Sequence, residues 1–155
     1  MCSHPIFNRA ALVAASLFLA ACGGSTLTGS VVSSSDLSFD YVEAELVSGE
    51  LVVRYLSNDV DPVPREPVRL SMDSAVSTGT EIPAVPNLRL SHYLVVRAPG
   101  GDLVEAPPFP DLDHGHILFN SVGTTSGHAV AGNFSLVFVD GSNLEGTFST
   151  SLTTP

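Results

Sequence analysis

The densest group of side chains that could do chemistry is the segment Asp111-Leu112-Asp113-His114-Gly115-His116. On an extended chain His114 and His116 point to the same side, because alternate residues of a strand share a face. Two imidazoles and a carboxylate from Asp111 or Asp113 form a ligand set that zinc and copper accept. The sequence therefore offers one candidate metal site.

The same segment also fits a polar turn that leads into a strand at Ile117, and we favour this interpretation. His92 and His128 could complete a site only if the fold brings them near, since neither stands at a recognisable ligand spacing. We predict no metal cofactor; the candidates, if a metal binds, are His114, His116, Asp111 and Asp113.

Motifs of catalysis are absent from the sequence. No Gly-x-Ser-x-Gly segment supplies a nucleophile elbow, and no glycine-rich loop matches a phosphate or dinucleotide fingerprint. The acidic loop with Asn58, Asp59, Asp61 and Glu66 offers oxygen ligands for calcium without the spacing of a helix-loop-helix site. No tryptophan and only 3 tyrosines are available for a flat sugar-binding platform. We expect the chain not to be an enzyme.

The beginning of the chain has the pattern of an export signal. Arg9 supplies a positive charge, and residues 10–21 are apolar except for Ser16. This run is shorter than the roughly 20 residues that span a bilayer as a helix, but it suits a secretory signal. It ends in Leu19-Ala20-Ala21-Cys22, which resembles the lipobox of bacterial lipoproteins. The resemblance implies a diacylglyceryl group on the Cys22 thiol, cleavage before Cys22 and acylation of the new amino terminus.

Processing of this kind predicts how the chain is divided and where it resides. The membrane becomes a partner through the lipid anchor, and the lipid on Cys22 is the expected covalent group, with no other cofactor. Gly23 after the lipidated cysteine implies, by the same resemblance, the outer membrane, with the domain facing the periplasm or the cell surface. The predicted segments are a signal peptide over 1–21, a lipidated cysteine and tether over 22–27, and a β-rich domain over 28–155.

Charge excludes one class of partner. The chain has 6 basic and 16 acidic residues, a net charge of −10, and all its basic residues are arginines. Such a chain is repelled by nucleic acid phosphates and by anionic lipid headgroups. We therefore expect no nucleic acid partner, and we attribute the charge to solubility outside the cell.

The elements that must position these groups are short strands. No segment keeps a 3.6-residue apolar period, and 13 glycines and 11 prolines divide the chain. We predict an all-β domain, a single antiparallel β-sandwich of about seven to nine strands. A small β-barrel is the alternative, because the alternation of apolar and polar residues is common to both.

The clearest expected hairpin joins strands near 38–47 and 50–57 through a Ser48-Gly49 turn, a length that fixes the register. This register sets Glu43 opposite Arg54 on the outer face. A shift by one residue would destroy the match on both faces. The pairs expected on the apolar face are Leu46 with Leu51, Ala44 with Val53 and Val42 with Tyr55.

A second hairpin is predicted near the C-terminus, around the turn Asp140-Gly141-Ser142-Asn143. Matching the apolar faces pairs Phe138 with Leu144 and Phe134 with Phe148. The whole segment 132–148 resembles the closing hairpin of uncharacterised β-rich lipoproteins from GC-rich soil bacteria, as does the Ser48-Gly49-Glu50-Leu51 hairpin. Many of those chains end in a cysteine that this one lacks, and the resemblance implies no activity.

These observations predict a lipid-anchored lipoprotein of the cell envelope whose domain is a structural or interaction module, with an envelope protein as a further partner. The alternative is an envelope protein that binds a small ligand, a carbohydrate or a metal.

Overall fold

Alternation of apolar and polar residues gives the chain strands with one inner and one outer face. The computed structural model describes residues 24–58, 65–73, 75–97 and 99–154. Two short helices are α1 (Ser30–Ser34) and α2 (Ala84–Asn87). The strands are β1 (Thr26–Thr28), β2 (Tyr41–Val47), β3 (Glu50–Ser57), β4 (Arg65–Asp73), β5 (Glu81–Pro83), β6 (Leu88–Tyr93), β7 (Val95–Arg97), β8 (Leu103–Glu105), β9 (Leu112–Val122), β10 (Ala129–Phe138) and β11 (Asn143–Thr153).

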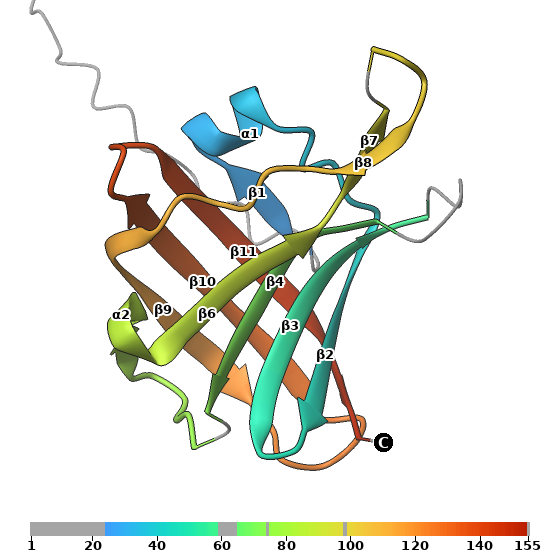
Figure 1. Ribbon diagram of the computed structural model, residues 1–155. Helices are drawn as coiled ribbons and strands as arrows, with labels where there is room; N and C mark the ends of the chain where they lie inside the picture. The colour runs from blue at the N-terminus through green and yellow to red at the C-terminus, as the bar shows by residue number, and fades with distance from the viewer. Residues whose placement is uncertain (1–23, 59–64, 74, 98, 155) are drawn as a thin grey trace, which may run out of the picture.

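Most of the strands belong to one sheet that curls into a nearly closed barrel (Figure 1). The strand order is β5-β9-β10-β11-β2-β3-β4-β6, with β1 added to β11, while β7 and β8 form a separate hairpin that projects from the barrel. The end strands β5 and β6 are joined by α2, which packs against β9 and β6. The all-β prediction is confirmed, and the barrel alternative describes the shape better than two stacked sheets.

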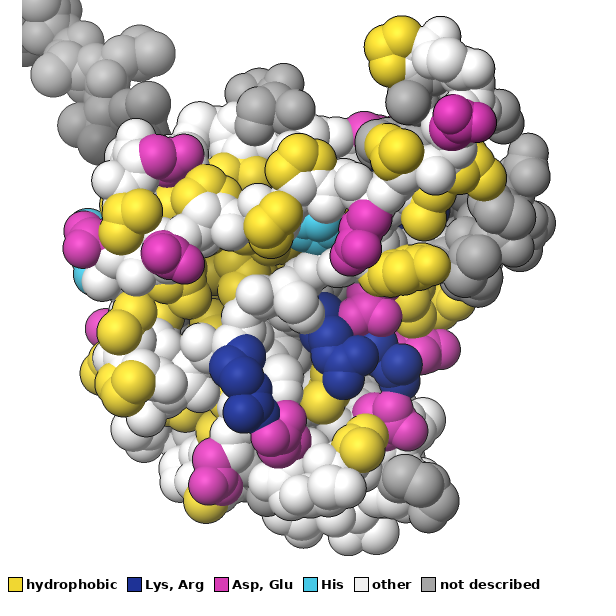
Figure 2. All heavy atoms as spheres, viewed as in Figure 1, with side chains coloured by type: hydrophobic (Ala, Val, Ile, Leu, Met, Phe, Trp, Pro, Cys, Tyr) yellow, Lys and Arg dark blue, Asp and Glu magenta, His cyan; other side chains and the backbone are white. Residues whose placement is uncertain are grey.

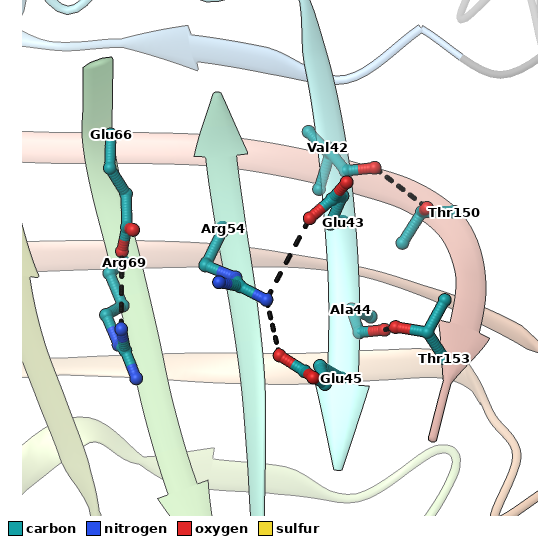
Figure 3. Close-up of polar contacts among 9 residues, drawn as sticks. All are labelled: Val42, Glu43, Ala44, Glu45, Arg54, Glu66, Arg69, Thr150 and Thr153. Carbon is teal, nitrogen blue, oxygen red and sulfur yellow. Dashed lines mark hydrogen bonds and ion pairs between the residues drawn. The ribbon is translucent and has the colours of Figure 1, made fainter. Parts of the chain in front are cut away.

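One pairing in the barrel is parallel, so the expectation of a purely antiparallel sheet is wrong. β11 meets β2 through Leu152 opposite Ala44 and Thr153 opposite Glu45. Two threonine hydroxyls extend this short seam, as Figure 3 shows. Thr150 Oγ1 donates to the Val42 carbonyl at 2.8 Å, and Thr153 Oγ1 donates to the Ala44 carbonyl at 3.0 Å. The seam therefore depends on side chains as well as on the backbone.

Replacing Thr150 with valine is expected to lower the free energy of unfolding by about 1 kcal/mol, because the Val42 carbonyl loses its donor while the side-chain volume is kept. Chemical denaturation measures the change. Thr124→Val, at an exposed position between β9 and β10, is the matched control and should change stability by less than about 0.5 kcal/mol. Equal effects at the two positions would mean that the hydroxyl does not support the seam.

The register predicted for the first hairpin is confirmed. Ser48 and Gly49 both have positive φ, +52° and +85°, as a two-residue turn between twisted strands requires. Glu43 lies opposite Arg54 as expected. On the inner face Leu46 pairs with Leu51, Ala44 with Val53 and Val42 with Tyr55.

The register predicted for the second hairpin is wrong by two residues on one strand. Leu136 pairs with Leu144, and Phe134 pairs with Gly146 rather than with Phe148. A Cβ on Gly146 would come within 2.6 Å of Phe134 Cζ, so the aromatic ring occupies the space that the missing side chain leaves. Each large ring thus faces a glycine across the pair, and the crowded contact of two phenylalanines is avoided.

Two element boundaries also differ from expectation. β9 begins at Leu112, so the segment expected as a turn before Ile117 is already strand, with Gly115 at φ +148° opposite Leu136. β1 covers Thr26 and Leu27 of the stretch expected as a tether together with Thr28 of the expected domain, and Gly24 accepts a hydrogen bond from Thr147 Oγ1 at 3.4 Å.

Large apolar side chains fill the barrel interior. The ring of Tyr55 is fully buried and packs edge-on against Phe39 and Phe134, with centroids 4.8 Å and 6.3 Å away. Its hydroxyl crosses from β3 to donate to the Thr147 carbonyl of β11 at 2.8 Å. Burial raises the pKa of the Tyr55 hydroxyl far above its ordinary value, because the phenolate would have to exist inside the core. The other rings buried in the core are Phe119, Phe134, Phe138 and Phe148.

Tyr55→Phe is expected to lower the free energy of unfolding by about 1 kcal/mol at pH 7 through loss of this cross-barrel bond. The wild type should also lose stability as the pH rises above about 10, since unfolded Tyr55 releases a proton that the native state keeps. The variant should show a shallower alkaline loss. Denaturation midpoints at pH 7 to 11 measure both effects. Tyr93→Phe, at a 45% exposed position, is the control, and an alkaline loss that Tyr55→Phe leaves unchanged would contradict the assignment.

Candidate functional site

The predicted metal ligands lie at and just before the beginning of β9, where Asp113 and His114 contact each other and His116 lies near a different carboxylate. His114 is exposed, and its Nδ1 donates to Asp113 Oδ2 at 2.9 Å. His116 Nδ1 lies 3.9 Å from Glu81 Oε1 on the neighbouring strand β5. The backbone carbonyl of Asp111 accepts from Val139 N–H at 3.0 Å. In the part of the chain that the structure describes, no three His, Cys, Asp or Glu side chains are arranged to hold a metal ion.

The two further histidines are not brought to this group. His128 precedes β10, and His114 lies opposite Val137 near the other end of that strand. At about 3.3 Å per residue along the strand, the two histidines are separated by on the order of 30 Å. His92 lies under the segment 106–110, described below as the proline strap. The prediction that His114 and His116 share one face of a strand agrees with the register of β9. Among the described residues, the fold does not bring a third ligand to these two histidines.

A cluster of arginines and carboxylates covers the outer face of β2, β3 and β4 (Figures 2 and 3). Arg54 on β3 contacts Glu45 and lies 3.9 Å from Glu43 Oε2, both on β2. Arg69, directly opposite Arg54 on β4, lies 3.8 Å from Glu66 Oε1. Figure 2 shows these basic side chains gathered on one face with acidic ones around them. The carboxylates offset the repulsion that two facing arginines would otherwise produce.

Burial and neighbouring charges shift the pKa values of two carboxyl groups on this face. Desolvation raises the pKa of the Glu66 carboxyl, against the neighbouring Arg69 and Arg54 guanidinium groups, which lower it. On the same outer face, hydrogen bonds from Arg89 and then Ser71 lower the pKa of Glu50. Arg54 and Arg69 each have a carboxylate partner, so the cluster is an internal ion-pair network, in which Arg54 Nε is buried without a hydrogen-bond partner among the described residues.

The proline strap, residues 106–110, covers a cavity of about 250 Å³ at one end of the barrel. Phe109 of the strap stacks on Phe138 with ring centroids 6.0 Å apart and meets the His92 ring edge-on at 4.8 Å. The cavity is lined by apolar Val31, Leu37, Leu94 and Phe109 together with His92, Asp140 and Ser142.

His92 is the unusual polar group of this cavity. Its Nε2 bonds to the Pro107 carbonyl at 2.8 Å, which makes Nε2 the protonated nitrogen. In the neutral ring Nδ1 is then a hydrogen-bond acceptor, and among the residues that the structure describes it is buried without a partner. The sequence analysis considered His92 only as a metal ligand. Phe109, whose ring contacts the His92 ring, is distant from His92 in the sequence. The sequence signal for a rigid segment at Phe109 is the run Pro107-Pro108-Phe109-Pro110.

The wall of the barrel formed by β1, β10 and β11 is almost uncharged. The only ionisable residue in these three strands is Glu145, and α1 beside them contains only serine and valine. Thr26 and Thr147 exchange a hydroxyl hydrogen bond of 2.9 Å on its outer surface. The Ser149 N–H donates to Ser25 Oγ at 3.2 Å. This neutral wall is therefore the surface to which the beginning of the folded chain is fixed.

Cys22 and the predicted signal peptide lie outside the residues that the structure describes. Among the helices of residues 24–154 that are described, none has the length and apolar character needed to cross a membrane. Comparisons with protein-family models, with curated proteins and with solved structures give no match to this chain.

Proposed function

We propose that the chain is a lipoprotein of the bacterial cell envelope, lipidated on Cys22, whose barrel is an interaction module outside the cytoplasm. The observation that carries this proposal is the segment Leu19-Ala20-Ala21-Cys22 placed directly before a folded β-domain. The apolar run before it suits export, and acyl chains on Cys22 would hold the product to a membrane. Gly23 favours the outer membrane as the destination.

The packing of the barrel supports an interaction module. A barrel that carries a ligand inside leaves room between small or polar interior residues. Here the interior positions hold Tyr55, Phe119, Phe138 and Phe148, all nearly fully buried. A rigid filled barrel presents its outer faces, loops and projecting hairpin to partners, with an envelope protein as the expected partner.

The mass of the mature chain tests this proposal. The full-length chain is produced in a bacterium with two membranes, purified from the membrane fraction and digested. The expected N-terminal peptide begins at Cys22 and carries a diacylglyceryl group and an amide-linked acyl chain. Detection of a peptide that continues upstream of Cys22 without lipid, as the main product, would overturn the proposal.

The cavity under the proline strap favours binding of a small ligand as a second function. Its buried His92 Nδ1 needs a hydrogen-bond donor, and its walls are apolar, so a small molecule with one hydroxyl on an apolar body fits its chemistry. Phenol is a suitable probe. Nuclear magnetic resonance should show saturable shifts of the His92 ring nitrogens and of the Phe109 ring signals, and His92→Phe should remove the Phe109 shifts. Shifts that are absent or spread evenly over the surface would exclude this function.

A further inference from the structure

We propose that the neutral wall formed by β1, β10 and β11 lies against the headgroups of the membrane that holds the Cys22 lipid. This inference rests on the lipidation proposed above and adds an orientation to it: the barrel would lie on its side, with one defined wall toward the bilayer.

The first argument is the reach of the anchor. Cys22 and Gly24 are two residues apart, which is a span of at most about 7 Å. Gly24 is already fixed to the wall, because its carbonyl accepts from Thr147 Oγ1 at 3.4 Å. Ser25 is fixed as well, through the bond that its Oγ accepts from Ser149 N–H at 3.2 Å. A lipid on Cys22 would therefore enter the bilayer within about 10 Å of this wall.

The second argument is where the anchor meets the barrel. β1 runs antiparallel to β11, with Thr26 opposite Thr147 and Thr28 opposite Glu145. Gly24 and Ser25 consequently lie beside the middle of β11, which extends from Asn143 to Thr153. An anchor that starts at the middle of a strand brings the side of the barrel to the membrane, whereas an anchor at a strand end would bring up one of its rims.

The third argument is charge. The chain has a net charge of −10, so most orientations of the barrel on the membrane would bring carboxylates close to anionic headgroups. The neutral wall is the exception, with Glu145 as its single ionisable residue. Glu66 lies on β4, two strands beyond β2 in the sheet order. Glu43 and Glu45 lie on β2, which borders β11, and both face Arg54, whose guanidinium group offsets their charge toward the headgroups.

The outer side chains of the wall also suit headgroup chemistry. Exposed hydroxyls such as those of Ser149 and Ser151 can donate hydrogen bonds to phosphate and ester oxygens. Each such contact is weak, so the acyl chains supply the affinity and the wall sets the orientation.

Single-cysteine labelling tests the orientation. Conversion of the Cys22 thiol to a thioether leaves an introduced cysteine as the only free thiol of the mature chain. Ser149→Cys and Ser151→Cys place a fluorophore on the neutral wall, and Ser91→Cys on β6 places it on the opposite side as the matched control; all three positions are exposed. The lipidated proteins are reconstituted into phosphatidylethanolamine and phosphatidylglycerol vesicles that contain a headgroup-linked quencher.

We expect the quencher to reduce emission several-fold more at positions 149 and 151 than at position 91. Equal quenching at all three positions, or stronger quenching at position 91, would overturn the orientation while lipidation stands. Mass spectrometry of the same samples separates the two proposals, because a chain without lipid on Cys22 overturns both. Circular dichroism of each labelled variant confirms that the barrel is retained.

Discussion

Gly132→Ala is expected to lower the free energy of unfolding by about 3 kcal/mol, a large fraction of the stability of a domain of this size. The added Cβ would overlap the Leu118 carbonyl oxygen and lie 2.7 Å from Phe148 Cζ. The first neighbour is backbone and the second is a buried ring, so neither can move away at low cost. The pairing of β9 with β10 is also irregular at this point, between Ala131 and Gly132.

Urea denaturation of the domain measures this effect, with Gly100→Ala as the matched control. A Cβ on Gly100 would meet only Asp102 Oδ2, at 4.0 Å, so this change should alter stability by less than about 0.5 kcal/mol. If Gly132→Ala were as mild as the control, the close packing of β9, β10 and the Phe148 ring would be incorrect.

Local sequence signals were sufficient to predict the first hairpin. A two-residue turn between Val47 and Glu50 permits one register, and both the apolar pairs and the facing charges Glu43 and Arg54 agree with it. Because every constraint lies between Val42 and Tyr55, no knowledge of the remaining fold was needed. The same reasoning gave the all-β class, which follows from the alternation itself.

Matching the apolar faces alone does not determine the register of the second hairpin. Moving one strand by two residues keeps every side chain on its face, so the two registers have the same apolar pattern. Volume decides between them, because the rings of Phe134 and Phe148 need a glycine opposite them. The glycines were visible in the sequence, but their role as partners of rings was not.

Barrel closure was beyond sequence reasoning for a different reason. The seam joins Thr150 to Val42 across 108 positions, and a single sequence contains no signal for which distant edges meet. The contacts at the candidate sites also divide into those between sequence neighbours and those that depend on the completed fold. The contact of His114 with Asp113 is between neighbours and could be foreseen, whereas Glu81 beside His116 and Phe109 beside His92 depend on the completed fold.

Replacing Cys22 with serine is expected to abolish lipidation of the chain. The hydroxyl of serine cannot accept the diacylglyceryl group that thioether formation requires, so the lipid-dependent cleavage before residue 22 should fail too. The product should therefore keep the apolar segment 10–21 and carry no acyl chains. Cys2→Ser is the matched control, since that cysteine belongs to the segment expected to be removed.

The most direct test is fractionation of cells that produce the wild type, Cys2→Ser and Cys22→Ser chains, followed by detergent phase partitioning. Lipidation at Cys22 predicts that the wild type and Cys2→Ser appear in the detergent phase at the mature size, while Cys22→Ser does not mature to that size and yields no lipidated product. A Cys22→Ser chain that has the wild-type size and still partitions into detergent would contradict the account.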